Sequence, residues 1–118
     1  MSFDSREFFR LADSLASDGN TESEFRTAVN RAYYSVFNRY RERTGLSEGE
    51  KEGVHTKVRE LAERQFDTRT ATKLLGLFRA RVDADYYMSK PTTSVGAKQS
   101  LAKGRSLLKR LGEDPLAD

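Results

Sequence analysis

Apolar residues recur every three or four positions along nearly the whole chain, as they do on one face of an α-helix. The strict alternation of apolar and polar residues that is typical of a half-buried strand never continues for more than a few positions. The pattern therefore predicts an all-α protein. With 118 residues, the chain has the usual size of one domain, so we expect its helices to share a single core.

Breaks in the pattern divide the chain into five amphipathic helices. We expect the first helix over about 4–16, the second from Thr21 to Gly45 and the third from Val54 to near Phe66. The fourth should begin at a cap at Asp67 or Thr68 and end at a break at 89–94, and the fifth should continue from there to Leu111. Short connections between amphipathic helices predict an antiparallel five-helix bundle.

The second predicted helix is the best defined. Thr21 and Glu24 have the spacing of a capping box, in which each side chain satisfies a backbone amide at a helix start. Aromatic and aliphatic residues then cover so much of the helix circumference that we expect it at the centre, together with the fourth helix.

Two segments interrupt this order. Residues 45–53 contain three glycines and three glutamates, and we interpret them as an acidic, mobile connection. Gly112 is a suitable residue to end the fifth helix. We therefore expect one domain over 1–112 and a disordered C-terminal tail over 113–118.

Composition narrows the possible functions. The chain has no cysteine, which excludes disulfides, thiolate metal sites and cysteine nucleophiles and suits a reducing cytoplasm. It lacks both the apolar stretch of a signal peptide and the roughly 18 apolar residues of a membrane span. We therefore expect a cytoplasmic protein that does not enter a membrane. The net charge is only +3, so it favours anionic partners weakly.

Asp85 is the least expected residue of the fourth helix. It follows Phe78 and Val82 at seven and three residues, so its carboxylate is predicted to point along the apolar stripe. A lone buried carboxylate is costly, so it should pair with Arg81, or else with Arg39 or Arg43. Two interpretations remain open: a structural ion pair between core helices, or the charged floor of a ligand or RNA groove.

Other candidate groups are less specific. Tyr33 and Tyr34 are adjacent and must face different sides of their helix, so one can pack while the other binds elsewhere. His55 is the only histidine and cannot form a multi-histidine metal site. We expect it to cap or pack rather than to catalyse, and we expect no metal and no cofactor. The last helix is basic, with no acidic residue at 86–112, which suits either a solvated surface or phosphate contacts.

Three segments together resemble the HEPN families of compact helical bundles, and especially their small stand-alone prokaryotic members. These segments are Arg31-Ala32-Tyr33-Tyr34-x-x-Phe37, His55 after a polar loop, and Arg81-x-x-Ala84-Asp85-Tyr86. With the basic last helix, the resemblance covers roughly residues 22–111. It implies a five-helix bundle that often dimerises, commonly beside a small nucleotidyltransferase in toxin–antitoxin or defence pairs.

Many members of the families that the chain resembles are metal-independent ribonucleases, in which an arginine is followed after four to six residues by a histidine. The resemblance therefore raises the question whether this chain contains such a pair. No histidine lies at that spacing after Arg79 or Arg81, and no arginine lies at that spacing before His55. Tyrosine is a poor base at neutral pH because its pKa is about 10. The sequence thus predicts no catalytic residue of this type.

Our leading hypothesis is a non-catalytic, dimeric interaction module that binds a nucleotidyltransferase partner, a nucleotide or RNA. The predicted groove is formed by Arg31, Tyr34, His55, Arg81, Asp85 and Tyr86. The alternative is an active ribonuclease toxin in which folding brings His55, or Tyr86, into place as the acid or base. A third interpretation is a helical scaffold whose ionic residues only fix the packing.

Overall fold

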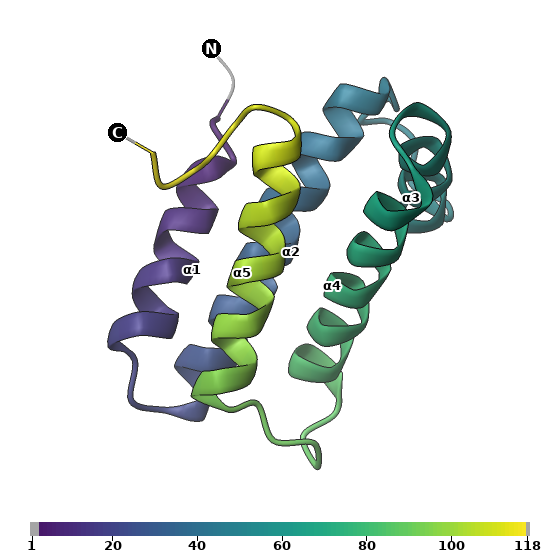
Figure 1. Cartoon of the computed structure of the whole chain (residues 1–118). Coiled ribbons are helices and arrows are strands. Elements are labelled where there is room, and N and C mark those ends of the chain that lie inside the picture. The colour runs from purple at the N-terminus through teal and green to yellow at the C-terminus, as the bar shows by residue number, and fades with distance from the viewer. Residues whose placement is uncertain (1–2, 118) are drawn as a thin grey trace.

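The structure, a computed structural model, describes residues 3–117. It consists of α1 (Arg6–Asp18), α2 (Glu22–Thr44), α3 (Val54–Gln65), α4 (Thr68–Tyr86) and α5 (Ser94–Arg110), and no strand occurs within these described residues (Figure 1). The prediction of an all-α protein with five helices is confirmed. None of the helices described combines the length and the apolarity that crossing a membrane requires.

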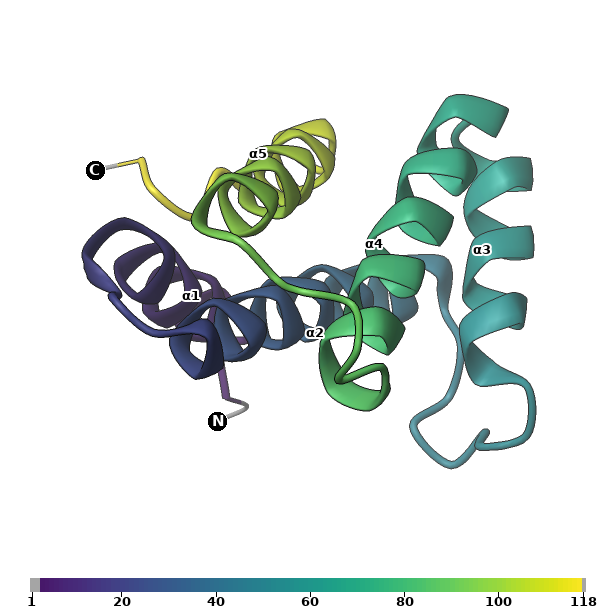
Figure 2. The ribbon, with the colours of Figure 1, turned by 90° about the horizontal axis from the view of Figure 1, so that it is seen from below.

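Helix α2 lies in the middle of the molecule, because it is in contact with each of the other four helices. Seen from below, α1 and α5 lie on one side of α2, and α4 lies on the other, with α3 against the outer side of α4 (Figure 2). The helices α1, α2, α4 and α5 run alternately down and up (Figure 1). The radius of gyration is 13.7 Å, near the roughly 13.5 Å expected of a compact chain of this length.

The ends of α2 follow directly from local sequence. The Thr21 side chain accepts from the Glu24 amide and the Glu24 carboxylate accepts from the Thr21 amide, which is the predicted capping box. At the other end Gly45 adopts φ 85°, a left-handed conformation that glycine reaches without steric cost. Gly112 ends α5 in the same way, with φ 75°.

The core contains buried residues of all five helices, and α1, α2 and α5 approach one another closely within it. Gly104 of α5 is buried, and a Cβ atom there would lie 2.9 Å from the Phe9 ring of α1 and 3.3 Å from Val36 of α2. The fully buried Tyr40 hydroxyl donates to the Leu107 carbonyl over 2.7 Å. Packing density and a satisfied polar group therefore join α2 to α5.

We expected the residues after Gly112 to be disordered, but residues 113–117 pack against the bundle. Glu113 forms ion pairs with Arg39 and Arg43, Pro115 is buried, and its carbonyl accepts from Arg10 Nε over 3.0 Å. Arg10 of α1 and Arg39 and Arg43 of α2 bind this segment, and Arg105 of α5 binds it through Asp114. The final position, Asp118, lies outside the described residues.

A single arginine of α2 holds the connection between α4 and α5. Arg26 Nη1 donates to the Ala84 carbonyl over 2.8 Å, and its Nη2 donates to the Lys90 carbonyl over 2.7 Å. The last turn of a helix leaves carbonyls without partners. Arg26 supplies donors to such carbonyls and to the turn that follows them.

Candidate functional site

The C-terminal half of α4 and the middle of α2 bring together the residues that the sequence singles out. Arg81 and Asp85 are four residues apart on α4 and so lie one helical turn from each other. Tyr33 and Tyr34 of α2 face this turn, and Tyr86 ends it. The predicted proximity of Tyr34, Arg81, Asp85 and Tyr86 is what the structure shows.

Arg81 is 7 % exposed, which is unusual for a charged residue. Four aromatic rings surround its guanidinium, and we call them the aromatic cage: the guanidinium carbon lies 5.4 Å from the ring centroids of Tyr34 and Phe78, 5.7 Å from Tyr33 and 5.8 Å from Tyr86. A desolvated cation–π contact is worth about 2 kcal/mol or more. The cage therefore replaces part of the lost hydration of this charge.

Asp85 supplies the carboxylate that neutralises Arg81. Its Oδ2 lies 3.5 Å from Arg81 Nη1 and accepts a hydrogen bond of 2.9 Å from Asn30 Nδ2. The Asp85 side chain is 25 % exposed, so one carboxylate faces both the cage and solvent. Asn30 was not among the predicted site residues. It lies four residues before Tyr34 and so shares its side of α2, which is the signal that could have identified it.

The alternative partners of Asp85 that the sequence left open are excluded. Arg39 pairs with Glu42 and Glu113, and Arg43 pairs with Glu113, at the end of α2 that leads to Gly45. These two arginines hold the C-terminal segment and do not contribute to the candidate site.

His55 lies on the side of the cage that faces α3. Its ring packs between Phe37, with centroids 4.5 Å apart, and Phe78, at 5.1 Å. Its Nδ1 is 2.5 Å from the Tyr33 hydroxyl. Burial, and then the charges of Arg81, Arg59 and Arg41, lower the pKa of His55 below 6.5. The imidazole is therefore neutral at pH 7.

The pKa of the Tyr33 hydroxyl is shifted in the opposite direction. Burial raises its pKa above 10, because the phenolate form would be desolvated. Tyr33 consequently remains protonated at neutral pH and is able to donate to His55. With Tyr33 as the donor, the proton of the neutral imidazole is on Nε2, and the ring has no free acceptor nitrogen for general-base catalysis.

Two further arginines surround this cluster and were missed by sequence reasoning. The Arg59 guanidinium lies 5.0 Å from the Phe78 centroid, and the Arg41 guanidinium lies 5.4 Å from that of Phe37. With Arg81, three helices contribute one guanidinium each, and the carboxylate of Asp85 is paired with Arg81. The surroundings of His55 are thus positively charged and suit an anionic ligand.

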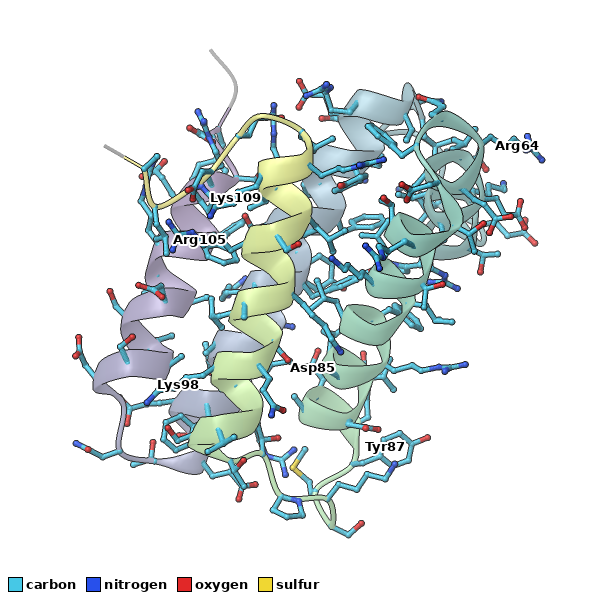
Figure 3. The ribbon with its side chains drawn as sticks, in the orientation of Figure 1. Arg64, Asp85, Tyr87, Lys98, Arg105 and Lys109 are labelled. Atoms are coloured by element: carbon cyan, nitrogen blue, oxygen red, sulfur yellow. The ribbon has the colours of Figure 1, made fainter. Side chains whose placement is uncertain are left out.

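Arg31 and Tyr86 are placed very differently. Arg31 was expected in the groove, but its guanidinium lies 5.2 Å from the ring of Phe8 on α1. The structure therefore does not bring it to the cage. Tyr86 is 69 % exposed, so its ring covers Arg81 on one side and meets solvent on the other. Asp85 in Figure 3 marks the end of α4 at which this ring lies.

The neighbouring Tyr87 offers a useful contrast. It is 50 % exposed and lies over the ammonium of Lys90 at 5.1 Å, away from the cage. Figure 3 shows it pointing outward from the lower end of α4. Both adjacent tyrosines are therefore exposed, but of the two it is Tyr86 that contacts Arg81.

The arrangement suits recognition better than proton transfer. Exposed aromatic faces, a fixed carboxylate and nearby guanidinium groups are able to stack on a base, accept its amino hydrogens and attract its phosphate. Within residues 3–117, no group of three or more His, Asp or Glu side chains is arranged to hold a metal ion. No protein-family model, curated protein or solved structure matches the chain.

Proposed function

We propose that the protein is a cytoplasmic, dimeric and non-catalytic interaction module of the HEPN type, which binds RNA or a nucleotide at the aromatic cage. A nucleotidyltransferase is the partner protein that the resemblance suggests. The observation that carries the proposal is the position of Tyr86, whose exposed ring lies directly over the buried Arg81.

The tyrosines of the cage and the charged residues around them each contribute one element of recognition. The half-buried Tyr34 and the exposed Tyr86 present ring surface on which a base stacks, an interaction worth about 1–3 kcal/mol per base. The partly exposed Asp85 accepts hydrogen bonds from an exocyclic amine. Arg59 and Arg41 supply charge for a phosphate at the His55 side. The buried Arg81 holds the two tyrosines and Asp85 in position.

The test compares two adjacent tyrosines. Tyr86→Ala removes the ring above Arg81, whereas the matched control Tyr87→Ala removes an exposed ring that does not touch the cage. Fluorescence anisotropy with a labelled oligoribonucleotide and with ATP should show binding that Tyr86→Ala weakens by roughly tenfold or more. Tyr87→Ala should leave it within about twofold. Equal losses in both variants, or no binding by the wild type, would refute the ligand part of the proposal.

The partner part is tested separately. Affinity-tagged protein should retain a nucleotidyltransferase encoded beside it, and light scattering should give the mass of a dimer. If the protein is a monomer that retains no such partner and binds neither probe, only the helical fold is left of the hypothesis.

A ribonuclease toxin is the second candidate, and the observation in its favour is a neutral imidazole among three arginines. Phosphodiester cleavage needs a proton acceptor beside a phosphate-binding charge. Expression that stops growth, together with RNA cleavage that His55→Ala or Arg59→Ala abolishes in folded protein, would favour this candidate. The Tyr33 hydrogen bond to Nδ1 leads us to expect no cleavage.

A further inference from the structure

The outer face of α5 has a regular pattern of charge that the aromatic cage does not use. Its most outward positions are exposed and follow each other at alternate steps of four and three residues: the uncharged Val95, Gln99, Ala102 and Ser106, and then Lys109. On either side lie basic residues seven apart, with Lys98 and Arg105 on one flank and Lys103 and Arg110 on the other. We call these the two basic rows.

The basic rows carry more charge than the chain neutralises. Arg105 is paired with Asp114 over 3.0 Å and Arg110 with Asp67 over 2.6 Å. Among residues 3–117, Lys98 and Lys103 have no carboxylate oxygen within 4.0 Å. No acidic residue occurs at 86–112, so α5 itself supplies none.

Hollows on both sides make α5 a ridge. Toward α1 lies a hollow of about 490 Å³, with Phe9, Leu101 and Leu116 among its lining residues. Its wall carries three basic residues, Lys98, Arg105 and Lys109, against one acidic residue, Asp13 of α1. Figure 3 shows these three basic side chains on the side of α5 that faces α1. Toward α4 lies a second, shallow and wide-open hollow, which is lined by Lys73, Lys103, Gln99, Ala102 and Ser106.

The spacing is that of a helix–helix seam. In paired helices, seam positions at alternate steps of three and four are mostly apolar, and charged positions seven apart on each flank select the partner. Here Val95 and Ala102 are apolar and Gln99 and Ser106 are polar, so the charged flanks supply most of the selection. Both flanks are basic here. A second copy of this chain would therefore place like charges opposite each other, which is destabilising. The required partner has acidic residues on both flanks of its own seam.

We propose that α5 docks an acidic amphipathic helix of a different protein, whose glutamates reach into the two hollows and pair with the basic rows. This inference is independent of the proposed function, because it concerns other side chains on another part of the bundle. A single nucleic-acid strand fits less well. Among residues 3–117, the one aromatic ring lining the two hollows is the fully buried Phe9, so these residues expose no ring there on which bases could stack.

The experiment uses the full chain and a fluorescent synthetic helix of about three heptads, with leucine in the seam and glutamate on both flanks. The test variant is Lys98→Glu with Lys103→Glu. The matched control is Lys51→Glu with Arg64→Glu, which makes the same change in net charge at exposed positions outside α5. Arg64 points away from α5 in Figure 3. Thermal unfolding of each variant verifies that it is folded, and Lys98→Gln with Lys103→Gln replaces the test variant if it is not.

We expect the acidic helix to bind the wild type with an affinity that falls as salt is raised, and to bind the test variant at least about tenfold more weakly. The control should remain within about twofold. A peptide with lysine on its flanks should not bind the wild type. Absence of binding, or equal weakening in the control, would overturn the proposal. So would binding of single-stranded RNA that depends on Lys98 and Lys103 when the acidic helix does not bind.

Discussion

Positive charge is held in two opposite ways in this molecule. Arg81 is 7 % exposed, lies within four rings and shares the carboxylate of Asp85. Lys98 and Lys103 of α5 are exposed and lie over hollows of the surface. A buried charge must be satisfied within the fold, so its neighbours depend on it. An exposed charge contributes little to the fold and remains available to a partner.

The strongest way to break this contrast is to remove the buried charge. Arg81→Ala leaves Asp85 without its cation and opens a cavity among the four rings. We expect a loss of about 3 kcal/mol in the free energy of unfolding, the lower end for a broken buried pair, because Asp85 is partly hydrated. Urea denaturation measures it. The exposed Arg79 on the same helix is the control, and Arg79→Ala should change stability by less than about 0.5 kcal/mol.

Two glycines compare the inner face of α5, at Gly104, with the surface of α4 that Lys103 contacts, at Gly76. At Gly104, on the inner face, an added methyl group would lie 2.9 Å from the Phe9 ring, so Gly104→Ala should destabilise by about 1–2 kcal/mol. At Gly76, opposite the outer basic row, the nearest atom is the flexible Lys103 Nζ at 3.4 Å. Gly76→Ala should stabilise by about 0.5–1 kcal/mol because alanine favours the helix. Urea midpoints of both variants test this, and two changes of the same sign would contradict it.

His55, which lies beside the cage, should make the stability of the fold depend on pH. The pKa of His55 is below 6.5 in the folded protein and about 6.5 in the unfolded chain. At pH values between these two pKa values, the unfolded chain therefore binds more protons than the folded protein. Stability should therefore be complete above about pH 6.5 and decline as the pH falls through the folded pKa. Unfolding midpoints at several pH values, for the wild type and His55→Gln, measure this decline. The variant should lose it, since no other histidine is present. A midpoint profile unchanged by the substitution would place His55 outside the desolvated cluster.

The smallest effects are expected at the exposed end of the contrast. Lys98→Ala and Lys103→Ala each should change the free energy of unfolding by less than about 0.5 kcal/mol. Their side chains have no carboxylate partner within residues 3–117 and bury little surface. Chemical denaturation measures these differences. A loss above about 1 kcal/mol at either position would show that the row has a structural role.

Local signals account for most of what the sequence predicted correctly. The bounds of α2 follow from the capping box at Thr21 and from Gly45, both of which act within one helical turn. The pairing of Asp85 with Arg81 is also local, since four residues separate them. Short-range chemistry of this kind can be read without knowing how the helices are arranged.

Predictions that needed the arrangement of helices were less successful. Arg31 and Tyr34 are about 60° apart around α2, but α2 has neighbours on several sides, so this small angle assigns one residue to α1 and the other to α4. Arg59 and Asn30 join the site only because α3 and α4 pack where they do. The order of residues 113–117 likewise depends on Arg39, which is 74 residues from Glu113 along the chain.

Arg26 has a consequence for both regions. One guanidinium grips the end of α4 at Ala84 and the turn at Lys90, close to where α5 begins. The connecting segment between the cage and the basic rows is therefore hydrogen-bonded to the central helix, α2. The same guanidinium thus constrains the end of the helix that carries the cage and the turn that leads to the helix that carries the basic rows.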